Sequence, residues 1–122
     1  MNEISPLKEA TLRRREEAIY PLRKVFQGEK VKYQFRDAPN DERTSQQELV
    51  VRFPSPEATE AVQRKVDNVF KTRGFQLSPV GDFKTYNQLF DEPEGFQTRV
   101  HLVLLTSEDG TLASILVKAE PA

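Results

Sequence analysis

The segment that most restricts the fold is residues 54–74, PSPEATEAVQRKVDNVFKTRG, because it carries a complete set of helix signals. Ser55 can cap the first free backbone amides, Pro56 is tolerated at the first helical position, and Gly74 can end the helix. A helix with one apolar stripe needs a second layer to cover it, so this segment predicts a helix packed on a sheet. The stripe consists of Ala58, Ala61, Val62, Val66, Val69 and Phe70.

A second helix is predicted within residues 1–28, over about residues 6–27. Ser5 and Pro6 give the same start signal, and Leu7, Thr11, Ala18, Leu22 and Val25 recur at helical spacing. Pro21 lies inside this pattern. Because proline removes a backbone donor and crowds the preceding turn, we expect the helix to bend or split near Pro21.

Residues 30–36, KVKYQFR, have the alternation of a strand with one dry and one wet side. Val31, Tyr33 and Phe35 share the apolar side, which we expect to face the core. The polar residues then share the opposite side: Lys30, Lys32, Gln34 and Arg36.

The remaining strands are predicted at 48–53, 75–80, 96–105 and 111–118. Residues 83–90, FKTYNQLF, are ambiguous, because their aromatic spacing fits a short helix whereas their Thr and Tyr content fits a strand; we expect the strand. The segments at 96–105 and 111–118 carry apolar residues on both faces and are placed in the middle of the sheet. Residues 119–122 are expected to fray. The element order predicts an α+β fold, with an antiparallel or mixed sheet of about five strands and two helices packed on it.

Length and composition predict one domain over residues 1–122 in a soluble, cytoplasmic protein. A chain of 122 residues can bury one adequate core without metal or disulfide. It has no cysteine, which excludes disulfides, thiolate catalysis and cysteine-based zinc sites. No window approaches the roughly 20 apolar residues of a membrane span. The net charge of -1 favours no particular polyelectrolyte partner.

Catalytic signals are sparse, and we expect no cofactor, metal site or catalytic residue. The only histidine is His101, in a predicted strand, with no spacing that links it to a nucleophile. An enzyme using His101 as general base is therefore the second alternative. The acidic groups around residues 91–94 and 40–43 lie among turn-forming residues and match no calcium-loop pattern, so we interpret them as solvated turns.

Nucleic-acid binding is the first alternative, because Lys30, Lys32 and Arg36 would form a strip of cations on one strand face. Base stacking would need aromatic rings on that same face. Tyr33 and Phe35 are expected to point the other way, so one face cannot offer both rings and cations.

The leading hypothesis is a small non-enzymatic intracellular protein-interaction module, such as an adaptor, inhibitor or assembly component, with a protein partner. Phe83, Tyr86 and Phe90 would form a contact patch if exposed and would be core if buried. Together with the strip of cations, they are the candidate binding residues. Edge strands at 31–36 or 75–79 could also pair with a second copy and form a homodimer.

Overall fold

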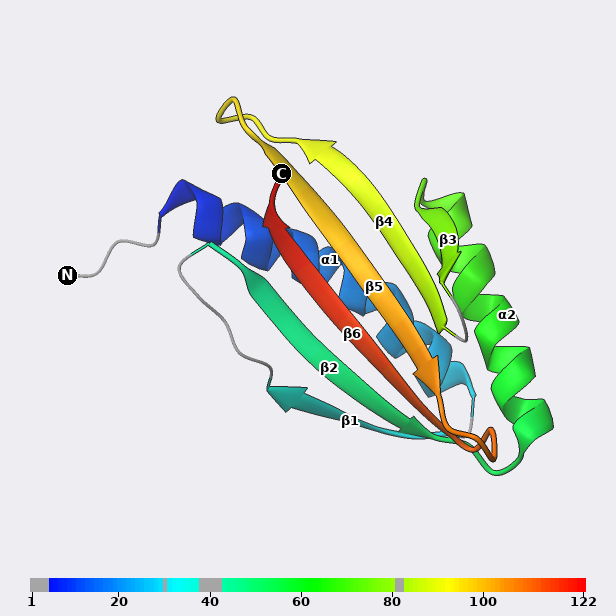
Figure 1. The fold of residues 1–122 in the computed structure, drawn as a ribbon. Helices are drawn as coiled ribbons and strands as arrows, with labels where there is room; N and C mark the ends of the chain where they lie inside the picture. The colour runs from blue at the N-terminus through cyan, green and yellow to red at the C-terminus, as the bar shows by residue number, and fades with distance from the viewer. Residues whose placement is uncertain (1–4, 30, 38–42, 81–82) are drawn as a thin grey trace.

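The computed structural model describes residues 5–29, 31–37, 43–80 and 83–122, and within them two helices lie on one face of a six-stranded antiparallel sheet (Figure 1). Across the sheet the strand order is β1-β2-β6-β5-β4-β3. This is the predicted α+β fold, with six strands where the sequence predicts about five. In chain order the elements are α1 (Pro6–Gly28), β1 (Lys32–Asp37), β2 (Ser45–Arg52), α2 (Pro56–Thr72), β3 (Gln76–Val80), β4 (Phe83–Asp91), β5 (Gln97–Thr106) and β6 (Leu112–Pro121).

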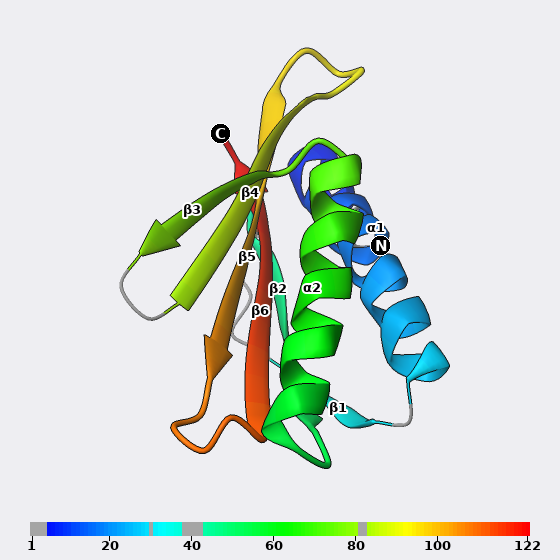
Figure 2. The ribbon, with the colours of Figure 1, turned by 90° about the vertical axis from the view of Figure 1, so that its right-hand side faces the viewer.

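The core lies between the sheet and the two helices, which are seen side by side on the same face in Figure 2. Helix α2 contributes Val62, Val66 and Phe70 from the predicted stripe, and each is almost fully buried. The ring of Phe70 packs edge-on against Phe75 and tilted against Tyr86. Burial of these aromatic and aliphatic side chains is the main stabilising contribution, since each fully buried one adds about 1.5–3 kcal/mol.

Both helices begin where the Ser-Pro signals predict. The Ser5 hydroxyl accepts a hydrogen bond from the Lys8 amide, and the Ser55 hydroxyl accepts one from the Ala58 amide, both at 3.2 Å. The sequence predicts a bend or a split near Pro21; helix α1 is not split there but continues to Gly28. Pro21 is itself buried, and the helix on both sides of it packs on the sheet, so tertiary packing outweighs the missing hydrogen bond.

The ambiguous segment is a strand, β4, because it pairs along its length with β5 and over its first half with β3. The predicted central position of the last two strands is confirmed, since β6 pairs with both β2 and β5. Residues 119–121, predicted to fray, instead belong to β6. Thr98 pairs with Pro121, and the Ala122 amide donates to the Gln97 carbonyl at 2.9 Å, which holds this end on β5.

Candidate functional site

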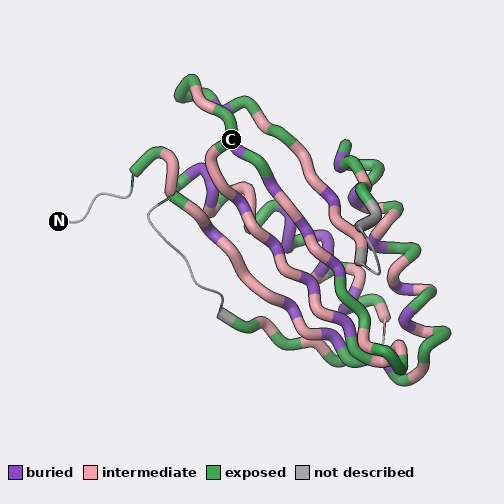
Figure 3. Tube along the Cα trace, in the orientation of Figure 1, coloured by how far each residue is buried: buried purple, intermediate pink, exposed green. Residues whose placement is uncertain are grey.

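The sheet has one covered face and one open face. Both helices pack on the covered face, and in Figure 1 the strands lie in front of α1, with the open face toward the viewer. Side chains alternate between the faces along each strand, as the burial pattern of β6 shows (Figure 3). No described element covers the open face, so its side chains face outward.

Five aliphatic residues lie together on the open face of β2, β6 and β5, toward the β5–β6 hairpin, and we call them the apolar strip. In the strand register, Ser114 is flanked by Val50 on one side and Leu105 on the other, and the next row pairs Leu116 with Val103. Leu105 and Leu112 are 46% and 37% exposed, and the other three are half-buried. The apolar strip consists of Val50, Val103, Leu105, Leu112 and Leu116.

A shallow hollow lies over the apolar strip. Val50, Leu105 and Leu112 form part of its lining, and Arg36 and Glu48 stand at its polar border. An apolar centre with a polar border is the arrangement found at protein contact surfaces.

Three cations border the strip at the β1–β2 side of the open face, and we call Lys32, Arg36 and Arg52 the basic corner. Lys32 lies directly opposite Arg52 in the β1–β2 register. Neither forms an ion pair with any residue that the structure describes. Arg36 is 65% exposed and lies 3.7 Å from the Glu48 carboxylate, a separation at which a surface pair contributes little.

His101 also lies on the open face, but its imidazole is already engaged. Its Nε2 is 3.1 Å from Oε1 of Glu120, and Nζ of Lys118 is 3.3 Å from the other oxygen of the same carboxylate. The residues directly opposite on the neighbouring strands are Asn87 and Lys118. Neither is a hydroxyl or thiol nucleophile that a general base would activate.

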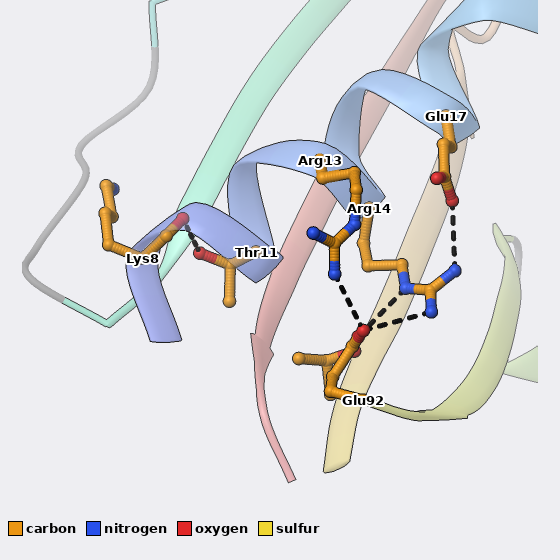
Figure 4. A network of polar contacts seen from close by, with 7 residues as sticks. Lys8, Thr11, Arg13, Arg14, Glu17 and Glu92 are labelled. Carbon is orange, nitrogen blue, oxygen red and sulfur yellow. Dashed lines mark hydrogen bonds and ion pairs between the residues drawn. The ribbon is translucent and has the colours of Figure 1, made fainter. Parts of the chain in front are cut away.

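A second polar cluster lies on the covered side, where Glu92 follows the last residue of β4 (Figure 4). Its side chain has no exposed surface. Arg14 donates to both carboxylate oxygens at 2.9 and 3.0 Å, Arg13 donates to one at 3.0 Å, and Thr98 donates its hydroxyl proton at 2.7 Å. The guanidinium of Arg14 also lies 4.1 Å from the centre of the Phe90 ring. These contacts join the first half of α1 to the β4–β5 hairpin.

The Glu92 cluster is held ionised. Burial alone would raise the pKa of Glu92, but the hydrogen bonds from Arg14, Thr98 and Arg13 and the charge of Arg14 hold its pKa below the ordinary value. The hydrogen bond to Glu92 in turn raises the pKa of Arg14. Every carboxylate oxygen is occupied by a donor from the chain, so the cluster offers a ligand no free acceptor and serves to connect helix and sheet.

The structure separates the predicted binding residues. Lys30 lies outside the described residues, whereas Lys32 and Arg36 lie on the open face as expected from strand alternation. Phe83 begins β4. Tyr86 is buried, and its hydroxyl donates to Asp67 at 2.9 Å, so it takes the core alternative. Phe90 is half-buried against the core beneath Arg14.

Sequence reasoning missed the apolar strip, Arg52 and Glu92. The strip residues within 96–105 and 111–118 predict centrally placed strands, although strands open on one side can carry the same pattern. The register that brings Arg52 to Lys32 is set by the hairpin and cannot be read from spacing alone. Glu92 was assigned to a solvated turn; the turn at residues 93–95 is exposed, but the carboxylate that precedes it is buried.

Comparisons with protein-family models, with curated proteins and with solved structures gave no significant match. Among the described residues, no helix combines the length and apolar character required to cross a membrane. Within the same ranges, no group of three or more acidic, histidine or cysteine side chains is arranged to hold a metal ion.

Proposed function

We propose that the protein is a non-enzymatic protein-interaction module that binds its partner through the open face of the sheet. The observation that carries this proposal is the apolar strip, which exposes large parts of Leu105 and Leu112 at the β5–β6 hairpin end of an uncovered sheet face. Contiguous apolar side chains on a surface lower the free energy of association when a partner covers them.

The position of the strip supports a contact role over a folding role. Leu105 and Leu112 lie close to the β5–β6 turn, on the face of the sheet opposite the helices and the core. Polar β-formers such as Thr would occupy these positions equally well in a strand that only faced water. Polar residues lie around the strip, among them Arg36 and His101, and resemble the border of an interface.

The test compares two variants with the wild-type chain as bait in extracts of the native host. The double variant Leu105→Thr, Leu112→Thr removes exposed apolar surface while keeping β propensity. We expect it to lose a partner that wild type retains after nuclease treatment. With the recovered partner purified, the dissociation constant should rise about tenfold or more, since each lost leucine removes buried apolar area.

The matched control is Tyr20→Gln, which removes a large, 55% exposed side chain from α1 on the opposite side of the molecule. It should bind the purified partner as wild type does. Circular dichroism and urea unfolding must show that both variants are folded. Equal binding by the open-face variant and wild type, or loss of binding on Tyr20→Gln alone, would contradict the proposal.

A further inference from the structure

We infer that the segment bound by the open face is an acidic, amphipathic peptide segment of another protein, with carboxylates that meet the basic corner and apolar side chains that cover the apolar strip. This inference rests on the proposed function and specifies the chemistry of the partner. Its starting point is the placement of Lys32 opposite Arg52.

Like charges directly opposite each other on neighbouring strands destabilise a sheet. Lys32 and Arg52 occupy such a pair, both are exposed, and neither meets a carboxylate among the residues described. No contact among the described residues offsets this repulsion. A violation of local rules without a structural gain is expected at functional positions, where a partner supplies the missing counter-charge.

The carboxylates elsewhere on the open face do not supply that counter-charge. Lys118, Glu120 and His101 interact with one another near the opposite end of β5 and β6. Glu48 is the one carboxylate paired with the basic corner in the described part of the chain, and it sits at 3.7 Å from Arg36. Three cations thus face one carboxylate, which leaves the corner positively charged.

The basic corner is continuous with the apolar strip. Arg52 pairs with Leu112 in the β2–β6 register, and Arg36 shares the lining of the hollow with Val50 and Leu105. A ligand that covers the strip must therefore pass beside the cations. An extended or helical peptide that carries Asp or Glu next to Leu, Ile or Phe would match both features at once.

The same corner is less suited to single-stranded nucleic acid. Stacking of bases needs aromatic faces beside the cations. The aromatic side chains of β1, Tyr33 and Phe35, point to the covered side, where Tyr33 packs against Phe26 and Arg23 lies over the Phe35 ring. The surface beside the basic corner is aliphatic, which favours a peptide.

The experiment selects binders from a display library of random linear peptides on the folded wild-type chain. The selections are repeated on the double variant Lys32→Glu, Arg52→Glu. The control is the double variant Lys24→Glu, Arg64→Glu, which has the same charge change at residues exposed on the helices. A fluorescent single-stranded DNA oligonucleotide is titrated in parallel. Peptides enriched on wild type are synthesised, and their affinities are measured by fluorescence anisotropy at low and high salt.

We expect wild type and the helix control to enrich peptides that combine acidic and apolar residues. The affinity of those peptides should fall about tenfold or more on Lys32→Glu, Arg52→Glu and should weaken with salt. Enrichment of apolar peptides without acidic residues, lost on Leu105→Thr, Leu112→Thr, would overturn the inference and leave the proposed function standing. Absence of any peptide that depends on the open face would overturn both. DNA binding that depends on Lys32 and Arg52, without peptide binding, would assign the corner to nucleic acid instead.

Discussion

The carboxylate of Glu92 links two segments that lie far apart in the sequence. Arg13 and Arg14 come from α1, whereas Glu92 and Thr98 flank the turn between β4 and β5. Hydrogen bonds to a charged group contribute about 1.5–3 kcal/mol each when the group is desolvated, and less where a partner remains in water. Arg13 is 41% exposed, so Arg14 and Thr98 account for most of the stabilisation.

Replacement of Glu92 by glutamine keeps the shape of the side chain and removes its charge. The largely buried guanidinium of Arg14 then loses its buried counter-ion and keeps only the exposed carboxylate of Glu17, and one amide hydrogen-bond donor faces other donors. We expect the free energy of unfolding at neutral pH to fall by about 2–3 kcal/mol. Urea denaturation measures this, with Glu94→Gln as control, because Glu94 is exposed two residues further on. An equal effect of both substitutions would contradict the assigned role of Glu92.

Wild type and Glu92→Gln should also differ in how their free energy of unfolding depends on pH. The pKa of Glu92 is lower in the folded chain than its ordinary value of 4.5, so the unfolded chain binds the proton first as the pH falls. The contribution of Glu92 is therefore complete above this value and is lost as the pH drops through the folded pKa. Wild type and Glu92→Gln should approach equal stability in acid, and a difference that stays constant would exclude ionisation as its source.

Among the elements, the helices were predicted most closely because their signals are local. Ser-Pro starts and glycine-containing ends depend on a few neighbouring residues, and both helices begin at the predicted proline. The behaviour of Pro21 and the strand identity of residues 83–90 depend instead on packing against distant segments. Spacing within a short window contains no information about those contacts.

Two glycines at helix ends give a prediction at the scale of elements. Gly74 has a φ of +91°, and a Cβ there would lie 3.0 Å from Nε2 of Gln88, whereas Gly28 ends α1 with open space around it. Gly74→Ala should lower the free energy of unfolding by about 1–2 kcal/mol, because a left-handed backbone disfavours a side chain. Gly28→Ala should raise it by about 0.5 kcal/mol.

Thermal or urea unfolding of the two single variants measures this difference directly. The two substitutions are chemically identical, so the change in the unfolded chain is nearly the same in both. Equal effects of both would show that the backbone conformation at Gly74 does not determine the outcome.

Both edge strands carry features that disfavour pairing with a second copy. If β1 paired with itself in an antiparallel register centred on Gln34, Lys32 of one copy would face Arg36 of the other on the open side. At the other edge, Pro79 in β3 has no backbone donor. Charged residues and proline are common on exposed edges, where they limit such association. Charge repulsion at β1 and the missing backbone donor in β3 therefore both oppose the homodimer that was predicted from the edge strands.

At the scale of the whole molecule, the site was harder to predict than the fold. Alternation correctly assigned Lys32 and Arg36 to one side of β1, because period-two geometry is local. The surface beside them is assembled from β2, β5 and β6, whose residues lie far apart in the sequence. The proximity of Arg52 and Leu112 to Lys32 on the open face thus depends on strand order, and composition does not determine strand order.

Rates of amide hydrogen exchange should follow the order of the strands across the sheet. Strand β6 is paired on both sides and packed against α1, so we expect amides of residues such as Ile115 and Val117 to exchange slowest, at the rate of global unfolding. Amides of β1 and β3 that are not paired within the sheet should exchange much faster. Protection of β1 that rises with protein concentration would show that a second copy covers this edge after all.

Strand β6 also imposes an order on biosynthesis. It is the last of the described elements to leave the ribosome, yet it joins the β1–β2 hairpin to the β3–β4–β5 portion of the sheet. Before it emerges, β2 and β5 are not joined in the ladder, and the backbone edge that each will pair with β6 remains open to other nascent chains. The sheet therefore cannot be completed until β6 has been translated, and a pause or frameshift before Leu112 would leave the sheet in two unpaired parts for chaperones and proteases to recognise.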